Sequence, residues 1–164
     1  EDLLNTTTVT SADFNTVRAL VSGEINTFMG FEFERRGDEL TAIMPYRPDL
    51  IGNPTLPALH GGALAAFLEV TAIISLGWSL IWPRMEAGEG VEVMPALPKT
   101  IDITVDYLRS GLPRDAYARA EITRAGRRYA SVRVEAWQDN RARPTVQAMG
   151  HFLMPELEVQ PWND

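Results

Sequence analysis

The sequence predicts an α+β domain in which an antiparallel sheet curls around one long apolar helix. The stretch from Gly61 to Trp82 is rich in Ala and Leu and holds a single charged side chain, which is typical of a core helix. From Lys99 onward the pattern changes to four strand-like segments separated by turn residues. A run of antiparallel strands packed against a separate helix defines the α+β class.

The composition is that of one globular domain. With 164 residues, 45% of them hydrophobic, the chain is long enough for a single core, and we expect one domain over residues 1–164 with residues 1–30 as an N-terminal helical extension. The net charge of −7 argues against a nucleic-acid partner, because phosphate neutralisation requires a dominant basic face. The chain has no cysteine and only two histidines, so thiol chemistry and a multi-histidine metal site are not expected. No basic and apolar leader is visible at the start, and we therefore expect a cytoplasmic protein.

Three elements are predicted before the apolar helix. Apolar residues in 11–28 recur at close to helical spacing after a capping sequence, which indicates a short amphipathic helix. Residues 31–44 contain two alternating segments around a Gly-Asp pair, which favours a hairpin. Prolines and glycines recur through 45–57 and predict a shaped loop that leads into the helix.

Pro83 is expected to end the apolar helix, because proline lacks an N–H group and crowds the preceding turn. Residues 84–98 contain two glycines and two prolines and are expected to form a loop. The helix, at about 22 residues, is also long enough for a membrane span. Glu69 at its middle would be costly in lipid, and the strands that follow need an apolar element to surround. We therefore expect a buried central helix and no membrane partner.

Four strands are expected after the helix. Glycine, proline, asparagine and aspartate separate them, so consecutive strands are most simply antiparallel. In the middle two strands apolar residues alternate with polar ones, which predicts one buried face and one more polar face. The predicted strands span residues 100–109, 117–124, 129–138 and 145–154.

The most informative residue is Glu69, which lies nine residues after His60 in a His-Gly-Gly triplet. A carboxylate in an apolar segment is costly to bury unless it is hydrogen-bonded, paired or neutralised. Its presence therefore favours a chemical role, with a structural role at a subunit contact as the alternative. His60 fits either a helix cap or a general base beside the carboxylate.

An asparagine-containing loop, the His-Gly-Gly helix start with its acid, and a Thr-x-Asp-x-x-x-x-Tyr-Leu strand resemble the PaaI-type acyl-CoA thioesterases of the hotdog fold. The likeness covers residues 31–154. It implies that Glu69 is the catalytic carboxylate, acting as nucleophile or as general base on water. It also implies that the Gly61 N–H polarises the thioester carbonyl, which suits the free N–H groups and positive dipole end of a helix start. Thr100 matches a residue that holds the attacking water, and Asn53 resembles an asparagine that orients the thioester.

The resemblance further implies an acyl-CoA substrate, no metal or redox cofactor, and an active site between two subunits, so a homo-oligomer, either a dimer or a dimer of dimers, is expected. Gly62 is expected to contact substrate. Gly126 and the arginines that flank it, Arg124, Arg127 and Arg128, are expected to meet the CoA phosphates, with a solvated hairpin tip as the alternative. His151 is expected to be an ordinary strand residue. A hotdog hydratase or dehydratase and a non-catalytic acyl-CoA sensor remain alternatives, although the His-Phe-Pro context of the dehydratases is absent. The acyl group is left open.

Overall fold

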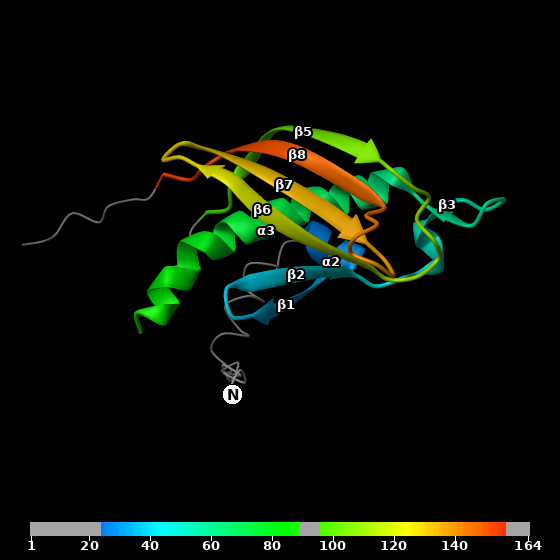
Figure 1. Cartoon of the computed structure of the whole chain (residues 1–164), viewed down its shortest axis with the longest axis horizontal. Helices are drawn as coiled ribbons and strands as arrows, with labels where there is room; N and C mark the ends of the chain where they lie inside the picture. Colours follow the sequence, from blue (N-terminus) through cyan, green and yellow to red (C-terminus); the bar gives the residue numbers. More distant parts are fainter. Residues whose placement is uncertain (1–23, 89–95, 157–164) are drawn as a thin grey trace, which may run out of the picture.

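The computed structural model describes residues 24–88 and 96–156, and it confirms the α+β layout (Figure 1). The helix predicted over 11–28 lies outside the described residues except for its last part, which forms a short helix. The described elements are α2 (Glu24–Met29), β1 (Glu32–Arg36), β2 (Glu39–Met44), the 3-10 helix η1 (Pro48–Leu50), β3 (Ile51–Asn53), β4 (Ala58–Leu59), α3 (Gly61–Glu86), β5 (Lys99–Tyr107), β6 (Ala116–Ala125), β7 (Tyr129–Trp137) and β8 (Val146–Leu153).

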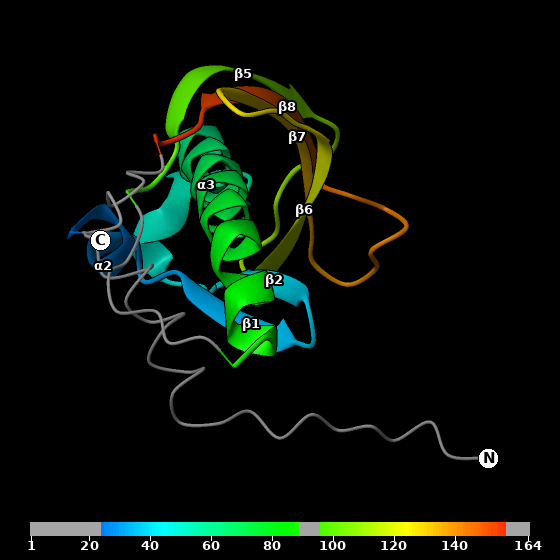
Figure 2. The same cartoon turned by 90° about the vertical axis from the view of Figure 1, so that its left-hand side faces the viewer.

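Six strands form one antiparallel sheet in the order β1-β2-β6-β7-β8-β5, and Figure 2 shows this sheet curving around α3. The consecutive strands β5 to β8 run antiparallel as expected, but β5 pairs with β8 and not with β6. Residues 108–115, which connect β5 to β6, cross three strand spacings of about 4.8 Å each. This crossing leaves β5 at the edge of the sheet.

The core lies between the concave face of the sheet and α3. Every second side chain of β7 is buried from Ala130 to Ala136, which confirms the predicted division into two faces. These side chains share one apolar cluster with Phe67 of α3. A second cluster joins Trp78 of α3 to Leu40 of β2. Both the β1-β2 end of the sheet and its other strands therefore pack on the same helix.

The predicted end of the helix at Trp82 is wrong, since α3 continues through Pro83 to Glu86. A proline loses its own N–H bond to the preceding turn, but its carbonyl still accepts from the following one. Here the N–H of Ala87 donates to the carbonyl of Pro83 at 3.1 Å. The loop predicted over 84–98 therefore begins later, and residues 89–95 lie outside the described part.

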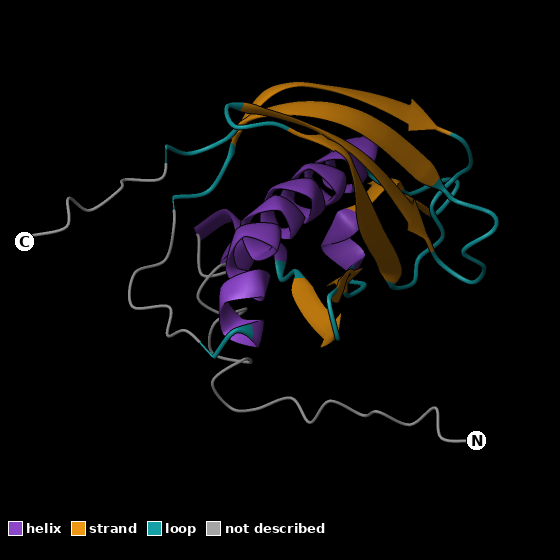
Figure 3. Cartoon of the chain, turned by 60° about the vertical axis from the view of Figure 1, so that its left-hand side comes forward, coloured by secondary structure: helices purple, strands orange, loops and turns teal. Residues whose placement is uncertain are grey.

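By length and composition α3 could cross a membrane, as the sequence also allows. In the structure 56% of its most apolar 18-residue window is buried inside the protein. Figure 3 shows the helix lying under the curved sheet. Its buried side chains belong to both apolar clusters of the core.

The predicted loop over 45–57 contains η1 and β3, and β3 pairs with β4 just after it in a separate two-stranded sheet that the sequence did not indicate. The N–H of His60 donates to the carbonyl of Leu50 at 2.8 Å. Gly52 lies so close to His60 that a Cβ at Gly52 would be 2.7 Å from the His60 Cα, which explains the glycine. The small sheet therefore fixes the residue from which α3 begins.

Candidate active site

Glu69 is half-buried on the side of α3 that faces β5, and a hydroxyl from that strand holds it. Thr100 Oγ1 donates a hydrogen bond to Glu69 Oε1 at 2.6 Å. This bond satisfies part of the demand of a carboxylate in an apolar helix. Within the described residues Oε2 has no hydrogen-bond partner. The structure therefore brings Glu69 and Thr100 together and leaves one carboxylate oxygen available for chemistry.

A β-bulge in β5 directs Thr100 toward the helix. The register of β5 on β8 shifts between Thr100 and Asp102, so Ile101 is the extra residue. Ile101 and Asp102 are both exposed, after which Ile103 faces inward again. Side chains of a regular strand alternate, so Thr100 and Ile103 could not both face α3 without the bulge.

His60 accepts hydrogen bonds from three of the first four N–H groups of α3. Its Nδ1 accepts from the N–H of Gly62 at 2.9 Å. Its carbonyl accepts from Ala63 and Leu64 at 3.0 and 3.2 Å. Over the described ranges the Gly61 N–H has no partner. It is therefore the one donor of the first turn left for a ligand at the positive end of the helix dipole.

His60 is the N-cap of α3, which is one of the two roles expected for it, the other being a general base. Because Nδ1 accepts a hydrogen bond, the proton of the neutral ring lies on Nε2. The nitrogen that could take a proton is thus already bonded, which favours the cap over proton transfer. The N–H of Gly62 donates to His60 and is not available to a ligand. The exposed Cα of Gly62 is the part of this residue that could contact substrate.

Tyr107 packs on the start of the helix, a contact that sequence reasoning missed. Its hydroxyl donates to the carbonyl of Gly61 at 2.8 Å, and a Cβ at Gly61 would be 3.2 Å from its ring. Tyr107 was identified only as a motif residue, and no local pattern links it to a residue 46 positions away. Strand β5 therefore holds Glu69 at one end, through Thr100, and Gly61 at the other.

Asn53 is exposed in β3, and its side chain shapes the turn that follows. Asn53 Oδ1 accepts from the N–H groups of Thr55 and Leu56 at 3.0 and 3.3 Å. This is a local turn role of the kind asparagine often has. The side-chain amide nitrogen has no partner among the described residues, so it remains a donor for a ligand.

Gly61 and Glu69 of one chain lie apart on the same helix. Eight residues at 1.5 Å each separate them by about 12 Å along the axis. One thioester carbonyl cannot contact both groups at that separation. The first turn and the mid-helix carboxylate of one chain therefore do not form a single site by themselves.

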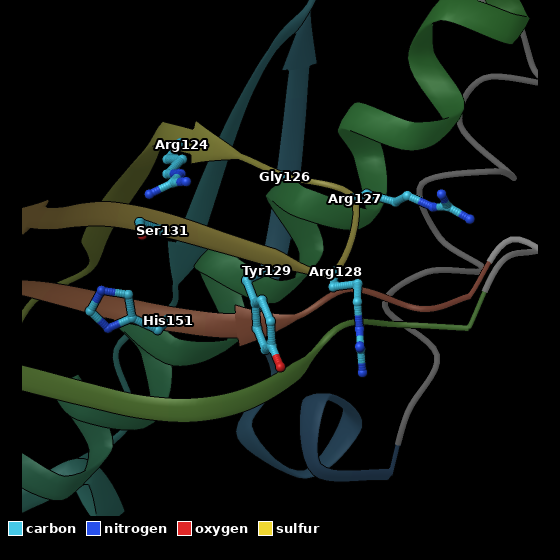
Figure 4. Close-up of a pocket in the computed structure, with 7 residues that line it drawn as sticks. All are labelled: Arg124, Gly126, Arg127, Arg128, Tyr129, Ser131 and His151. Atoms are coloured by element: carbon cyan, nitrogen blue, oxygen red, sulfur yellow. The ribbon is translucent and has the colours of Figure 1, made fainter.

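The turn between β6 and β7 lies at the rim of a cavity of about 460 Å³ that Gly126, Arg127 and Arg128 help to line (Figure 4). Gly126 donates its N–H to the carbonyl of Tyr129 at 2.8 Å, and a Cβ at Gly126 would be 2.9 Å from that oxygen. The turn geometry alone therefore requires this glycine. His151 lines the same cavity, where the sequence predicted no role for it.

Sequence comparisons with known proteins find acyl-CoA thioesterases. The model of the family described as acyl-CoA thioesterase N-terminal domain matches residues 53–153. The medium/long-chain acyl-CoA thioesterase YigI of Escherichia coli is 35% identical over 114 residues, which are 67% of this chain and 72% of YigI. Residues 1–47 match the model of a phage capsid protein family, but the strands β1 and β2 in this stretch belong to the same sheet as the rest.

Solved structures give the same result. A Chromobacterium violaceum protein is 34% identical, with a TM-score of 0.63 over 90% of this chain and 95% of that protein. The E. coli PaaI protein from the phenylacetic acid degradation operon has a TM-score of 0.65 over 87% of this chain and 92% of PaaI; at 14% identity it shows the fold alone. With the family model and YigI, these likenesses confirm the expected fold and enzyme class. The chain belongs to the hotdog-fold acyl-CoA thioesterases, enzymes that hydrolyse a thioester to a carboxylic acid and free CoA.

Proposed function

We propose that the protein hydrolyses medium- or long-chain acyl-CoA as a homodimer, in which each site joins Glu69 of one subunit to the Gly61 N–H of the other. The observation that carries the proposal is the 2.6 Å hydrogen bond from Thr100 to Glu69, which orients a carboxylate with one oxygen free. The acyl class comes from the name of the E. coli relative YigI at 35% identity. The cytoplasmic location and the absence of nucleic-acid and membrane partners remain predictions from the sequence.

The exposed edge strand supports the dimer. Strand β5 is the last strand of the sheet, and its side chains Ile101 and Tyr107 are 52% and 55% exposed. An open strand edge that carries apolar side chains promotes aggregation unless another element covers it. A second copy of β5, paired antiparallel about a two-fold axis, would cover both edges at once.

Such a pairing would also complete the site. In an antiparallel pair centred between Ile103 and Thr104, Thr100 of one subunit lies opposite the partner subunit's Tyr107. Within each chain Thr100 bonds Glu69 and Tyr107 bonds Gly61. The pairing therefore brings Glu69 toward the partner subunit's Gly61, which overcomes the separation of about 12 Å within one chain.

The chemistry then requires only these groups. The Gly61 N–H binds the carbonyl oxygen, where negative charge develops as the carbonyl carbon is attacked. Glu69 either attacks this carbon itself or takes a proton from the water that attacks it. In the water route the C–S bond breaks and the CoA thiolate leaves with the proton held by Glu69. Thr100 holds Oε1, so the proton passes through Oε2.

Gly126, Arg127 and Arg128 are proposed to meet the phosphates of CoA. Two adjacent exposed arginines suit phosphate oxygens, and they lie at a cavity in a chain of net charge −7. Asn53 and Gly62 are proposed to contact the thioester end, through the free amide nitrogen and the exposed Cα.

A thiol-release assay with short, medium, long and aromatic acyl-CoA tests the function. We expect turnover, with kcat/KM highest for the medium or long chains. Binding of all esters without thiol release would favour the acyl-CoA sensor. Preference for aromatic or short esters would overturn the proposed acyl class but not the hydrolysis.

A further inference from the structure

We propose that the outer face of the sheet carries a phosphate-binding site in which His151, held by Asp102, binds the phosphate in its protonated form together with Arg124 and Ser131. The proposal rests on the proposed function for one point only, namely that the phosphate belongs to the nucleotide end of the CoA substrate. The site itself is argued from the strands that build it.

The register of four strands aligns these residues. Arg124 pairs with Ser131, Ser131 with His151, and His151 with Asp102, across β6, β7, β8 and β5. Side chains of direct cross-strand partners share a face, with Cβ atoms about 5 Å apart. Ser131 lies between the buried Ala130 and a buried valine, so this is the outer face. Figure 4 shows Arg124, Ser131 and His151 at the same cavity.

Asp102 fixes the orientation and the proton of the imidazole. His151 Nδ1 lies 2.7 Å from Asp102 Oδ1, and a carboxylate only accepts, so Nδ1 carries the hydrogen. In the neutral ring Nε2 then has a lone pair, which repels phosphate oxygens. In the protonated ring Nε2 carries a hydrogen and donates. His151 therefore contributes a hydrogen bond to phosphate only when the ring is protonated.

The groups around His151 favour an anion. Asp102 is the one acid in the row, and it is engaged by the ring. Strand β8 itself adds only the apolar neighbours Met149 and Leu153. Four cations lie nearby, and among the described residues none of them forms an ion pair with an acid: Lys99, Arg124, Arg128 and Arg133. The charged groups that face His151 from the packed strands and the turn are Lys99 and Asp102 of β5, Arg124 of β6, Arg133 of β7 and Arg128 of the turn.

The cavity is large enough for part of a nucleotide, and it lies at the end of the sheet where β5 carries Thr100. Its volume is about 460 Å³, and Tyr129 on its wall is 55% exposed, so a base could stack on this residue. Tyr129 pairs with Leu153, and Leu153 with Lys99, the residue before Thr100. A phosphorylated nucleoside here would thus lie beside the end of β5 that holds the catalytic carboxylate.

Calorimetric titration with adenosine 3′,5′-bisphosphate tests the site. We expect His151→Gln and Arg124→Gln each to weaken binding about 10-fold or more at about pH 5, the loss of one charge-assisted hydrogen bond. At a pH high enough for the imidazole to be neutral, His151→Gln should change little, since Nε2 then has no hydrogen to donate. Because phosphate also titrates in this range, each variant is compared with wild type at the same pH. Arg36→Gln, the same charge loss on β1, should bind as wild type does. Equal affinity of His151→Gln and wild type at about pH 5 would overturn the proposal.

Inhibition kinetics identify the source of the phosphate. If it is the nucleotide of the substrate, the bisphosphate competes with acyl-CoA and does not inhibit hydrolysis of an acyl-pantetheine thioester. Inhibition of both substrates alike would assign the site to a separate nucleotide and overturn the link to CoA. The titration uses no thioester and therefore tests the phosphate site independently of hydrolysis. A protein that binds the bisphosphate but hydrolyses no thioester would contradict the proposed function and leave the phosphate site standing.

Discussion

Replacing Glu69 with glutamine is expected to lower kcat about 10²- to 10⁴-fold, the usual loss when a positioned base is removed. Glutamine keeps the size of the side chain, and its oxygen can still accept the hydrogen bond that Thr100 donates at 2.6 Å. Glutamine lacks the negative charge of Glu69, and an amide group takes the place of the basic Oε2, which has no hydrogen-bond partner among the described residues. The fold and KM should therefore change little, which kcat, KM and thermal unfolding measured together would show.

Glu86→Gln is the matched control. Glu86 lies at the exposed end of the same helix, so the same chemical change is made far from Thr100. This variant should keep the kcat of wild type. A Glu69→Gln enzyme that turns over nearly as fast as wild type would show that Glu69 is a structural acid.

Replacing Gly61 with proline is expected to lower kcat about 10²- to 10³-fold, as the loss of one oxyanion donor does. Gly61 is the first residue of α3, a position where proline is well tolerated. His60 before it has φ −64° and ψ 128°, an extended conformation that suits a residue before proline. The substitution therefore removes the free N–H and leaves the helix in place, which circular dichroism would verify.

Gly61→Ala separates the loss of the N–H from crowding. Both substitutions add a Cβ about 3.2 Å from the ring of Tyr107, so both require that ring to shift slightly. Only proline removes the donor. Alanine should keep most of the activity, and an equal loss in both variants would mean that Tyr107 packing, not the N–H, explains the effect.

Local patterns in the sequence predicted much of the fold. Helical spacing and turn residues gave α3, the β1-β2 hairpin and the strands β6 to β8, because each depends on neighbours a few positions away. The cap by His60 is local in the same sense. Pro83 was over-interpreted, since a proline in the last turn removes a single bond and the turn that follows can still form.

Contacts between distant residues were the part that could not be predicted. The pairing of β5 with β8 depends on where residues 108–115 cross, which no local pattern encodes. The same holds for the bulge at Ile101, which directs Thr100 inward. Tyr107 with Gly61 and Asp102 with His151 are 46 and 49 positions apart. The candidate site was thus predicted at its helix and, through the family resemblance, at Thr100 of β5, whereas the contact of Tyr107 with Gly61 was missed.

The central claim is that each site takes Glu69 from one subunit and the Gly61 N–H from the other. It is tested most directly by co-expressing Glu69→Gln and Gly61→Pro chains with different tags and purifying the mixed dimer through both. One of its sites would carry both defects and the other neither, so the mixed dimer should show about half the wild-type kcat per dimer although each parent is nearly inactive. A mixed dimer as inactive as its parents would show that both groups act within one chain, and would contradict the shared site.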